Sequence, residues 1–240
     1  MNHRNENDPI AKDLMEQHVR AMFRHDDDMR IRTINEPWSG EKPAPRFFLG
    51  RSIDGFVVWR IRHDVPDRLA GQLKALVESE PIVISNIQTK PKHYADYMSL
   101  FQADHSTSGP CYLISGQTKP TKQTVSITSN NIAEFSLSGF EWLIKEIDYD
   151  QPCVGLLQGN RVVAVCRSVR ITTEAHEAGL ETLEEFRGRG YAAAVAAGWA
   201  AEVYKKGVLP LYSTLWENTS SQRVASKLEM SCYGVNFTIW

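Results

Sequence analysis

The first part of the chain combines helical periods with short apolar runs that are typical of strands. Between residues 10 and 24 apolar side chains recur every three to four positions, which predicts an amphipathic helix. A second helical period begins near Asp64 or Asp67, either of which can cap it, and ends at Pro81. The other elements predicted here are strands at residues 29–36, 46–50 and 56–61 and a helix at residues 94–102.

The second part alternates strand-like and helix-like patterns with turns between them. Small polar residues at 106–110 predict a break, and residues 116–122 predict a loop rich in Lys, Thr and Pro. After this loop, Asn130 and Asn218 are the expected caps of two helices. The predicted elements are strands at 110–114, 124–127, 175–183, 209–215 and 233–239, a hairpin over 152–171, and helices at 131–147, 191–206 and 219–228. This order of elements predicts an α/β (α+β) fold.

The stretch from residue 180 to residue 194 has the features of an anion-binding turn between a strand and a helix. Gly188 and Gly190 give the backbone freedom and leave room for an anion beside the amide groups. The alanine-rich helix that follows contributes its unpaired N-terminal amides and the positive end of its dipole. Arg187 and Arg189 add positive charge. The turn therefore predicts a site for a phosphate or a pyrophosphate.

Two other phosphate-binding motifs are excluded by this stretch. The dinucleotide fingerprint requires a third glycine where this chain has Ala193. The P-loop requires a Gly-Lys-Ser/Thr sequence, which the chain lacks. The aromatic residues of the predicted helix at 131–147 are expected to form core or pocket wall rather than a cofactor site.

Composition excludes several classes of partner. The 240 residues are 42% hydrophobic and 23% charged, with a net charge of −2, so no basic field recruits nucleic acid or an anionic membrane. No apolar run approaches the roughly 20 residues that span a bilayer, and residues 1–9 lack the apolar core of a signal peptide. The four scattered cysteines indicate reduced thiols, and the expected location is cytoplasmic. The acidic run at 26–28 is expected to be a solvated turn, and no metal site is predicted.

Residues 187–192 resemble the Arg/Gln-x-x-Gly-x-Gly/Ala signature of the GNAT superfamily of N-acetyltransferases. A second resemblance follows in the predicted last helix, which keeps Asn218, Lys227 and Leu228 of a family motif and has Ser221 at its small position. The resemblance covers residues 124–240. It implies a mixed, mostly antiparallel central sheet flanked by helices, with acetyl-CoA bound between two strands that splay apart. The N-terminal region is then an additional α/β region.

The resemblance also implies which residues bind acetyl-CoA. The backbone of Thr182 and Leu183 would pair with the pantetheine arm, and the amides of the glycine turn would hold the pyrophosphate. Asn218 either bonds the pantetheine or caps its helix. The complete set of expected coenzyme-binding residues is Thr182, Leu183, Glu184, Arg187, Gly188, Arg189, Gly190, Tyr191, Ala192, Asn218 and Ser221.

The catalytic residues are harder to transfer, because Ala225 replaces the tyrosine that often protonates the coenzyme thiolate. Tyr212 and Tyr233 are the nearest alternatives, although a strand tyrosine more often packs in a core. For the base that accepts the ammonium proton, Glu181 is the first choice and His176 the second. Glu181 could equally be a surface carboxylate or bind a substrate ammonium group, and His176 could be structural.

The resulting hypothesis is an N-acetyltransferase that moves the acetyl group of acetyl-CoA to a primary amine of a small molecule. Residues 111–240 would be the catalytic domain, and residues 1–110 would shape the acceptor site. One alternative is a non-catalytic CoA-binding sensor or interaction protein, and another is an acetyltransferase that acts on protein amines. No nucleic-acid or membrane partner is expected, and a homodimer is left open.

Overall fold

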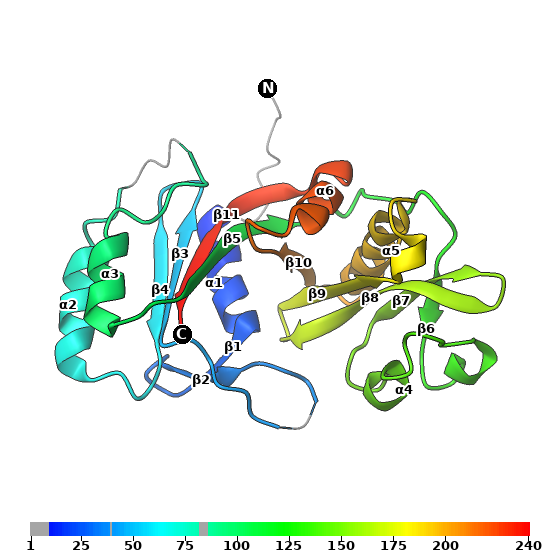
Figure 1. Cartoon of the computed structure of the whole chain (residues 1–240), viewed down its shortest axis with the longest axis horizontal. Coiled ribbons are helices and arrows are strands. Elements are labelled where there is room, and N and C mark those ends of the chain that lie inside the picture. The colour runs from blue at the N-terminus through cyan, green and yellow to red at the C-terminus, as the bar shows by residue number, and fades with distance from the viewer. Residues whose placement is uncertain (1–9, 39, 82–85) are drawn as a thin grey trace. The chain divides into compact units, whose positions relative to one another are not determined.

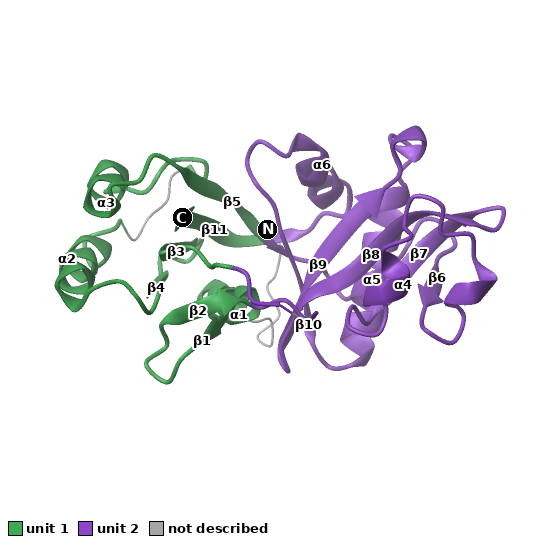
Figure 2. Cartoon of the chain, turned by 60° about the horizontal axis from the view of Figure 1, so that its bottom comes forward, with its two compact units in different colours: residues 1–34, 43–111, 232–240 green, residues 35–42, 112–231 purple. Residues whose placement is uncertain are grey.

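The computed structural model describes residues 10–38, 40–81 and 86–240, and the chain divides into two compact units (Figure 2). Unit 1 comprises residues 1–34, 43–111 and 232–240, and unit 2 comprises residues 35–42 and 112–231. The chain passes from unit 1 to unit 2 after residue 111, and it crosses between the units three more times, after residues 34, 42 and 231. Residues 35–42 belong to unit 2, and the last strand returns to unit 1.

Unit 1 is a mixture of helices and antiparallel strands. Its strands follow the order β4-β3-β11-β5, and β3 pairs antiparallel with both β4 and β11. The sequence around β1 and β2 forms a separate two-stranded hairpin. The elements are α1 (Ala11–Met22), β1 (Phe23–His25), β2 (Ile31–Ile34), β3 (Phe47–Ser52), β4 (Val57–Ile61), α2 (Asp67–Val77), α3 (Tyr94–Phe101), β5 (Ser106–Leu113) and β11 (Ser231–Ile239), as Figure 1 shows.

The core of unit 1 lies between its strands and helices α2 and α3. Phe47 of β3, Tyr97 of α3 and Phe237 of β11 are buried together in it. Helix α1 covers β3 and β11 elsewhere, where Gly50 and Gly234 leave room for the Met15 side chain. A Cβ on either glycine would come within 2.6 Å of a Met15 atom, so these strand glycines permit close helix packing.

Two sequence predictions in unit 1 were wrong in detail. Helix α2 begins after Pro66 without a side-chain cap, because Asp64 pairs with Arg62 and Asp67 pairs with Arg30. The predicted break at 106–110 is the start of strand β5. Its small polar side chains bond to β11: the Thr107 and Thr238 hydroxyls lie 2.6 Å apart, and Ser108 donates to the carbonyl of residue 236.

Unit 2 contains the region that carries the glycine turn. Its strands follow the order β10-β9-β8-β7-β6, in which β9 and β10 are parallel and the other pairs are antiparallel. The predicted mixed, mostly antiparallel fold is therefore confirmed. The elements are β6 (Val125–Ile127), α4 (Leu143–Glu146), β7 (Cys153–Gln158), β8 (Arg161–Ile171), β9 (Ala175–Thr182), α5 (Tyr191–Lys205), β10 (Leu209–Ser213) and α6 (Thr219–Lys227), with short 3-10 turns at Ile132–Glu134 and Glu184–Phe186.

Helix α5 is the central helix of unit 2. It packs on β7, β8 and β9, and its alanines bring the helix close to the strands while Trp199 and Val195 fill the interior. The side chain of α6 residue Ala225 belongs to the same core. Alanine favours the helical conformation, and its small side chain lets neighbouring elements pack closely around α5, so that the helix is buried on nearly every side. This packing holds the N-terminus of α5 at a fixed place. No helix in the described part of the chain combines the length and apolarity that crossing a bilayer requires.

The predicted helix at 131–147 was wrong. Only Leu143–Glu146 is α-helical, because Asn131 bonds locally instead of starting a helix: its side chain accepts from the Thr128 amide at 2.8 Å and donates to the carbonyl of residue 126. Gly139 then adopts a positive φ of 94°, which a helix cannot contain. The aromatic residues still form the expected core, since Phe140 is buried with Leu143 and the strand residue Val165.

The acidic run at 26–28 forms a turn. The Asp26 carboxylate accepts the amides of Asp28 and Arg30, at 3.1 and 2.9 Å. Within residues 10–38, 40–81 and 86–240, no group of three or more His, Cys, Asp or Glu side chains is placed to hold a metal ion. The four cysteines are free thiols, and burial raises the pKa of Cys153 to about 12.

Candidate functional site

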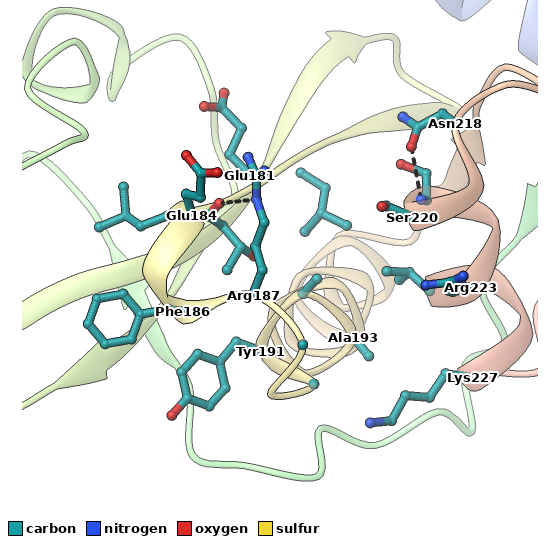
Figure 3. Close-up of a pocket in the computed structure, with 18 of the residues that line it drawn as sticks. Glu181, Glu184, Phe186, Arg187, Tyr191, Ala193, Asn218, Ser220, Arg223 and Lys227 are labelled. Atoms are coloured by element: carbon teal, nitrogen blue, oxygen red, sulfur yellow. Dashed lines mark hydrogen bonds between the residues drawn. The ribbon is translucent and has the colours of Figure 1, made fainter.

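The candidate site lies where strands β9 and β10 separate. Their parallel pairing runs from Ala175 and Leu209 to Glu177 and Leu211, whereas β9 itself continues to Thr182. Beyond that point lies a pocket of about 720 Å³. The end of β9, the glycine turn, the N-terminus of α5 and one face of α6 line it (Figure 3). The pocket lies within unit 2.

The glycine turn presents the N-terminus of α5 to this pocket. Gly188 and Gly190 have φ angles of 76° and 78°, which are left-handed conformations that glycine adopts without strain. Gly190 is the N-cap residue, and no side chain caps the helix. The first amides of a helix have no acceptor within the helix, and here they belong to pocket-lining residues Tyr191, Ala192 and Ala193. The arrangement is therefore suited to an anion.

Basic side chains surround the same end of the pocket. The Lys227 ammonium nitrogen lies 2.7 Å from the position that a Cβ of Gly190 would occupy, so it lies next to the turn. Arg223 lies one helical turn earlier on α6 and also lines the pocket. Arg187 lies between these residues and the end of β9 (Figure 3). Its Nε donates to the Thr182 carbonyl at 3.3 Å.

Most of the predicted coenzyme-binding residues line the pocket, but one side chain does not. Arg189 turns away: its guanidinium donates to the carbonyl of Glu185 and lies over the Phe186 ring at 5.2 Å. Asn218 caps α6, as its side-chain oxygen accepts the Ser221 amide at 3.1 Å, and this confirms the capping alternative. Its side chain nevertheless lies on the pocket wall.

The backbone of Leu183 is not available in the way that was predicted. Its amide donates to the carbonyl of Val163 on β8 at 3.0 Å. Successive residues of a strand direct their backbone groups to opposite edges. Thr182 therefore directs its backbone away from β8, in agreement with its carbonyl accepting from Arg187. Thr182, rather than Leu183, offers backbone groups at the edge that β10 leaves open.

The opposite end of the pocket is acidic. Glu181 and Glu184 lie on one side of Arg187, and Arg223 and Lys227 lie on the other (Figure 3). The Glu181 side chain is 50% exposed and accepts from the guanidinium of Arg167 at 3.1 Å. The pocket thus has a basic end at the helix N-terminus and a carboxylate end beside the last residues of β9.

The second predicted base, His176, lies outside the pocket. It is buried, and its Nδ1 lies 2.8 Å from the hydroxyl of Ser168, which also accepts the indole N–H of Trp199 at 3.1 Å. Burial lowers the pKa of His176 to about 4, so the ring is neutral at pH 7. The imidazole joins β8, β9 and α5 in the core, and the structure therefore favours the structural alternative.

Neither tyrosine considered as a general acid reaches the pocket lining. The Tyr212 hydroxyl is buried and donates to the carbonyl of Ser221 at 3.3 Å, and burial raises its pKa to about 12. Tyr233 is buried in unit 1 against His18. Ala225 packs in the core of unit 2 rather than on the pocket wall. Among the described residues, the tyrosine that lines the pocket is Tyr191.

Sequence reasoning missed several residues of this pocket. Arg223 and Lys227 were not predicted as site residues, although their spacing of four places them on one face of α6. Gly139 and Phe140 also line the pocket. Phe140 belongs to the aromatic residues that were expected to form core or pocket wall, whereas Gly139 was missed because its segment was expected to be helical.

The segment that carries the glycine turn matches a known family. Residues 148–232 match the family described as GNAT acetyltransferase. This segment of the chain is similar to the GNAT acetyltransferases. It holds β9, the glycine turn, α5 and α6, and therefore every pocket-lining residue except Gly139 and Phe140.

Individual proteins resemble the chain over different lengths. An uncharacterised N-acetyltransferase of Bacillus subtilis, YdfB, is 31% identical over 99 residues, which are 41% of this chain and 33% of that protein. The chain thus matches about a third of the length of this relative. Among solved structures, a GNAT-family acetyltransferase from Novosphingobium aromaticivorans (18% identity, TM-score 0.45) covers 57% of this chain and 65% of its own. Another from Colwellia psychrerythraea (15% identity, TM-score 0.48) covers 85% and 84%.

Proposed function

We propose that the protein is an acetyl-CoA-dependent N-acetyltransferase that acetylates a primary amine of a small molecule. The observation that carries this proposal is the two-ended pocket of the GNAT segment. A glycine-bounded helix N-terminus with Lys227 and Arg223 lies at one end, and the Glu181 carboxylate lies at the other. This arrangement suits a substrate with a pyrophosphate and an acceptor that carries positive charge.

The residues of the basic end fit the coenzyme. Gly188 leaves open space where a Cβ would stand, and Gly190 keeps the ammonium of Lys227 close to the amides of the turn. Pyrophosphate oxygens would be held by the amides of residues 190–192 together with Lys227 and Arg187. The Thr182 backbone, at the open edge of β9, is placed to pair with the amide groups of a pantetheine arm.

The residues of the acidic end fit an amine acceptor. Acetyl-CoA supplies the acetyl group as a reactive thioester. The amine must lose a proton to attack it, and a carboxylate within hydrogen-bond reach or one water away can take that proton. Glu181 is the pocket carboxylate that a fixed partner, Arg167, holds in place. Glu184 adds negative charge to the same side, which favours a cationic amine over an anionic acceptor.

A second candidate is a coenzyme-binding protein without catalysis. The specific observation in its favour is Ala225, which stands in the core where many relatives carry the tyrosine. Such a protein would bind acetyl-CoA without turning it over. The two candidates therefore differ in turnover and not in binding.

The experiment that separates them is thiol release from acetyl-CoA with a panel of primary amines. Spermidine, glucosamine, tyramine, L-lysine and a lysine-containing peptide are suitable probes, and mass spectrometry identifies the acetylated product. We expect release with at least one small amine above the rate of hydrolysis. Binding of acetyl-CoA with no acetylated product from any probe would support the non-catalytic candidate, and acetylation of the peptide alone would support a protein acceptor.

Lys227→Met should weaken acetyl-CoA binding about tenfold at low salt, because one charge-assisted contact to the pyrophosphate is lost. The difference from the unchanged protein should shrink as salt is added, since screening weakens the contribution of the lysine. Calorimetric titration at two salt concentrations measures both effects. Lys205→Met is the matched control, because Lys205 is exposed at the far end of α5 and pairs with Glu202. Equal affinities for the two variants would contradict the role of Lys227.

A further inference from the structure

Arg167 occupies a special position beside the candidate base. It lies on β8 directly opposite Gly179 of β9. Glu181 is two residues further along β9, so its side chain stands on the same face as the position of Gly179. The Arg167 side chain is 10% exposed and its guanidinium carbon lies 4.0 Å from the centre of the Trp142 ring. The guanidinium is therefore fixed between an aromatic ring and a pocket wall.

Three carboxylates contact the three nitrogens of this guanidinium. Nε lies 2.6 Å from Asp150, Nη2 lies 3.5 Å from Glu146, and Nη1 lies 3.1 Å from Glu181. Asp150 is fully buried, and burial raises its pKa to about 6 against the opposing effect of Arg167. Glu181, at the other end, is half exposed on the pocket. The guanidinium is thus anchored on its buried side and presents one N–H group to the pocket carboxylate.

This geometry goes beyond what a buried ion pair requires. Neutralising Asp150 would take one contact, whereas the planar guanidinium also contacts Glu146 and donates a hydrogen bond to Glu181. A glutamate side chain on a pocket wall otherwise samples several rotamers. We infer that Arg167 is a positioning residue for Glu181, which it holds in the orientation required for proton transfer. This inference rests on the proposed function, because the role of Glu181 as base is part of it.

The alternative is that Arg167 serves only to compensate Asp150 in the interior. The two hypotheses predict different behaviour of Glu181 when the guanidinium of Arg167 is replaced by a single ammonium group. Arg167→Lys keeps a positive charge beside Asp150 and Glu146, so the buried charge is not left alone. A lysine ammonium lacks the planar fork that reaches all three carboxylates. This variant therefore tests positioning while it spares the core.

The first readout needs no acceptor. Carbodiimide coupling of glycine ethyl ester labels accessible carboxylates, and peptide mass spectrometry compares Glu181 with Glu184 in the same peptide. We expect the ratio of Glu181 to Glu184 labelling to rise about threefold in Arg167→Lys, the size expected when a partly exposed ion pair is lost. An unchanged ratio would overturn the inference, because Arg167 would then not hold Glu181.

The second readout is a double-mutant cycle with the amine that the acceptor panel identifies. Arg167→Lys should lower kcat about tenfold with an unchanged KM for acetyl-CoA, because a less firmly held base is misplaced more often. In the Glu181→Gln background the same change should have almost no further effect, since it acts through Glu181. Independent losses that multiply in the double variant would overturn the inference and leave Arg167 a purely structural role.

Folding is checked with a second pair of substitutions. Asp150→Asn combined with Arg167→Met removes both buried charges together, so neither is left uncompensated. We expect this double variant to show the same rise in Glu181 labelling and the same loss of kcat as Arg167→Lys. Wild-type labelling and kcat in the folded double variant would overturn the inference. If no variant and no wild-type protein bound acetyl-CoA, the proposed function itself would fail, while the labelling ratio would still decide whether Arg167 holds Glu181.

Discussion

Gly190→Asp should weaken acetyl-CoA binding about 100-fold or more, through strain in a left-handed position and repulsion of the phosphates. Gly190 has a φ of 78°, which an aspartate adopts only with strain. Its carboxylate would lie beside the Lys227 ammonium and neutralise it, since that nitrogen lies 2.7 Å from the Cβ position. The substitution thus places negative charge at the N-terminus of α5 where the pyrophosphate is expected. Calorimetric titration with acetyl-CoA measures the loss.

The matched control for this variant is Gly159→Asp. Gly159 also has a positive φ, of 60°, with open space around its Cβ position, but it lies in the β7–β8 turn and does not line the pocket. Its backbone strain should be similar, and its effect on acetyl-CoA affinity should be negligible. Equal loss of affinity in both variants would show a general folding defect. Full affinity in Gly190→Asp would contradict a phosphate site at this turn.

Glu181→Gln should lower kcat for amine acetylation about 100-fold or more, because general-base catalysis contributes that much in typical enzymes. The amide is nearly the same size as the carboxylate and cannot accept the ammonium proton. The KM for acetyl-CoA should change little, since Glu181 lies at the end of the pocket opposite Lys227 (Figure 3). Steady-state kinetics with the amine that the panel identifies, compared with the unchanged protein, gives both constants.

Glu185→Gln provides the comparison for this substitution. Glu185 is exposed, lies four residues further along the chain, pairs with Arg161 at 3.1 Å, and does not line the pocket. Loss of that surface pair should have little effect on kcat. If the kcat of Glu181→Gln stayed within about twofold of that of the unchanged protein, Glu181 would not be the base, because general-base catalysis contributes far more. Glu184, which lines the same side of the pocket, or water would then accept the proton.

Local sequence signals predicted the parts of the fold in which neighbouring residues determine the structure. The β7–β8 hairpin, the glycine turn and α5 were expected within a residue or two of their observed bounds. The segment at 131–147 failed for the opposite reason. Its apolar spacing is helical, but Asn131 satisfies the backbone near Thr128, and Gly139 takes a positive φ. A periodic pattern cannot reveal that its apolar residues pack as a folded loop on β8.

The candidate site divides in the same way. The amides of the glycine turn follow from a short motif, and the strand that ends in Thr182 follows from alternation. The Lys227 ammonium over Gly190 and the contact of Arg167 with Glu181 depend on how α6 and β8 pack against β9. These tertiary contacts join residues between 14 and 37 positions apart, and no periodicity in the sequence records them. The prediction for His176 failed in the opposite way: a residue type that often acts as a base, at a suitable strand position, is buried in the core.

The central claim is that the pocket beyond the β9–β10 pairing binds acetyl-CoA. A crystal structure of the full chain grown with acetyl-CoA tests it most directly. We predict pyrophosphate density against the amides of residues 190–192, within reach of Lys227, and the thioester beside the open edge of β9 near Thr182 and Glu181. Acetyl-CoA bound at another place, or a pocket that stays empty at saturating acetyl-CoA, would contradict the account.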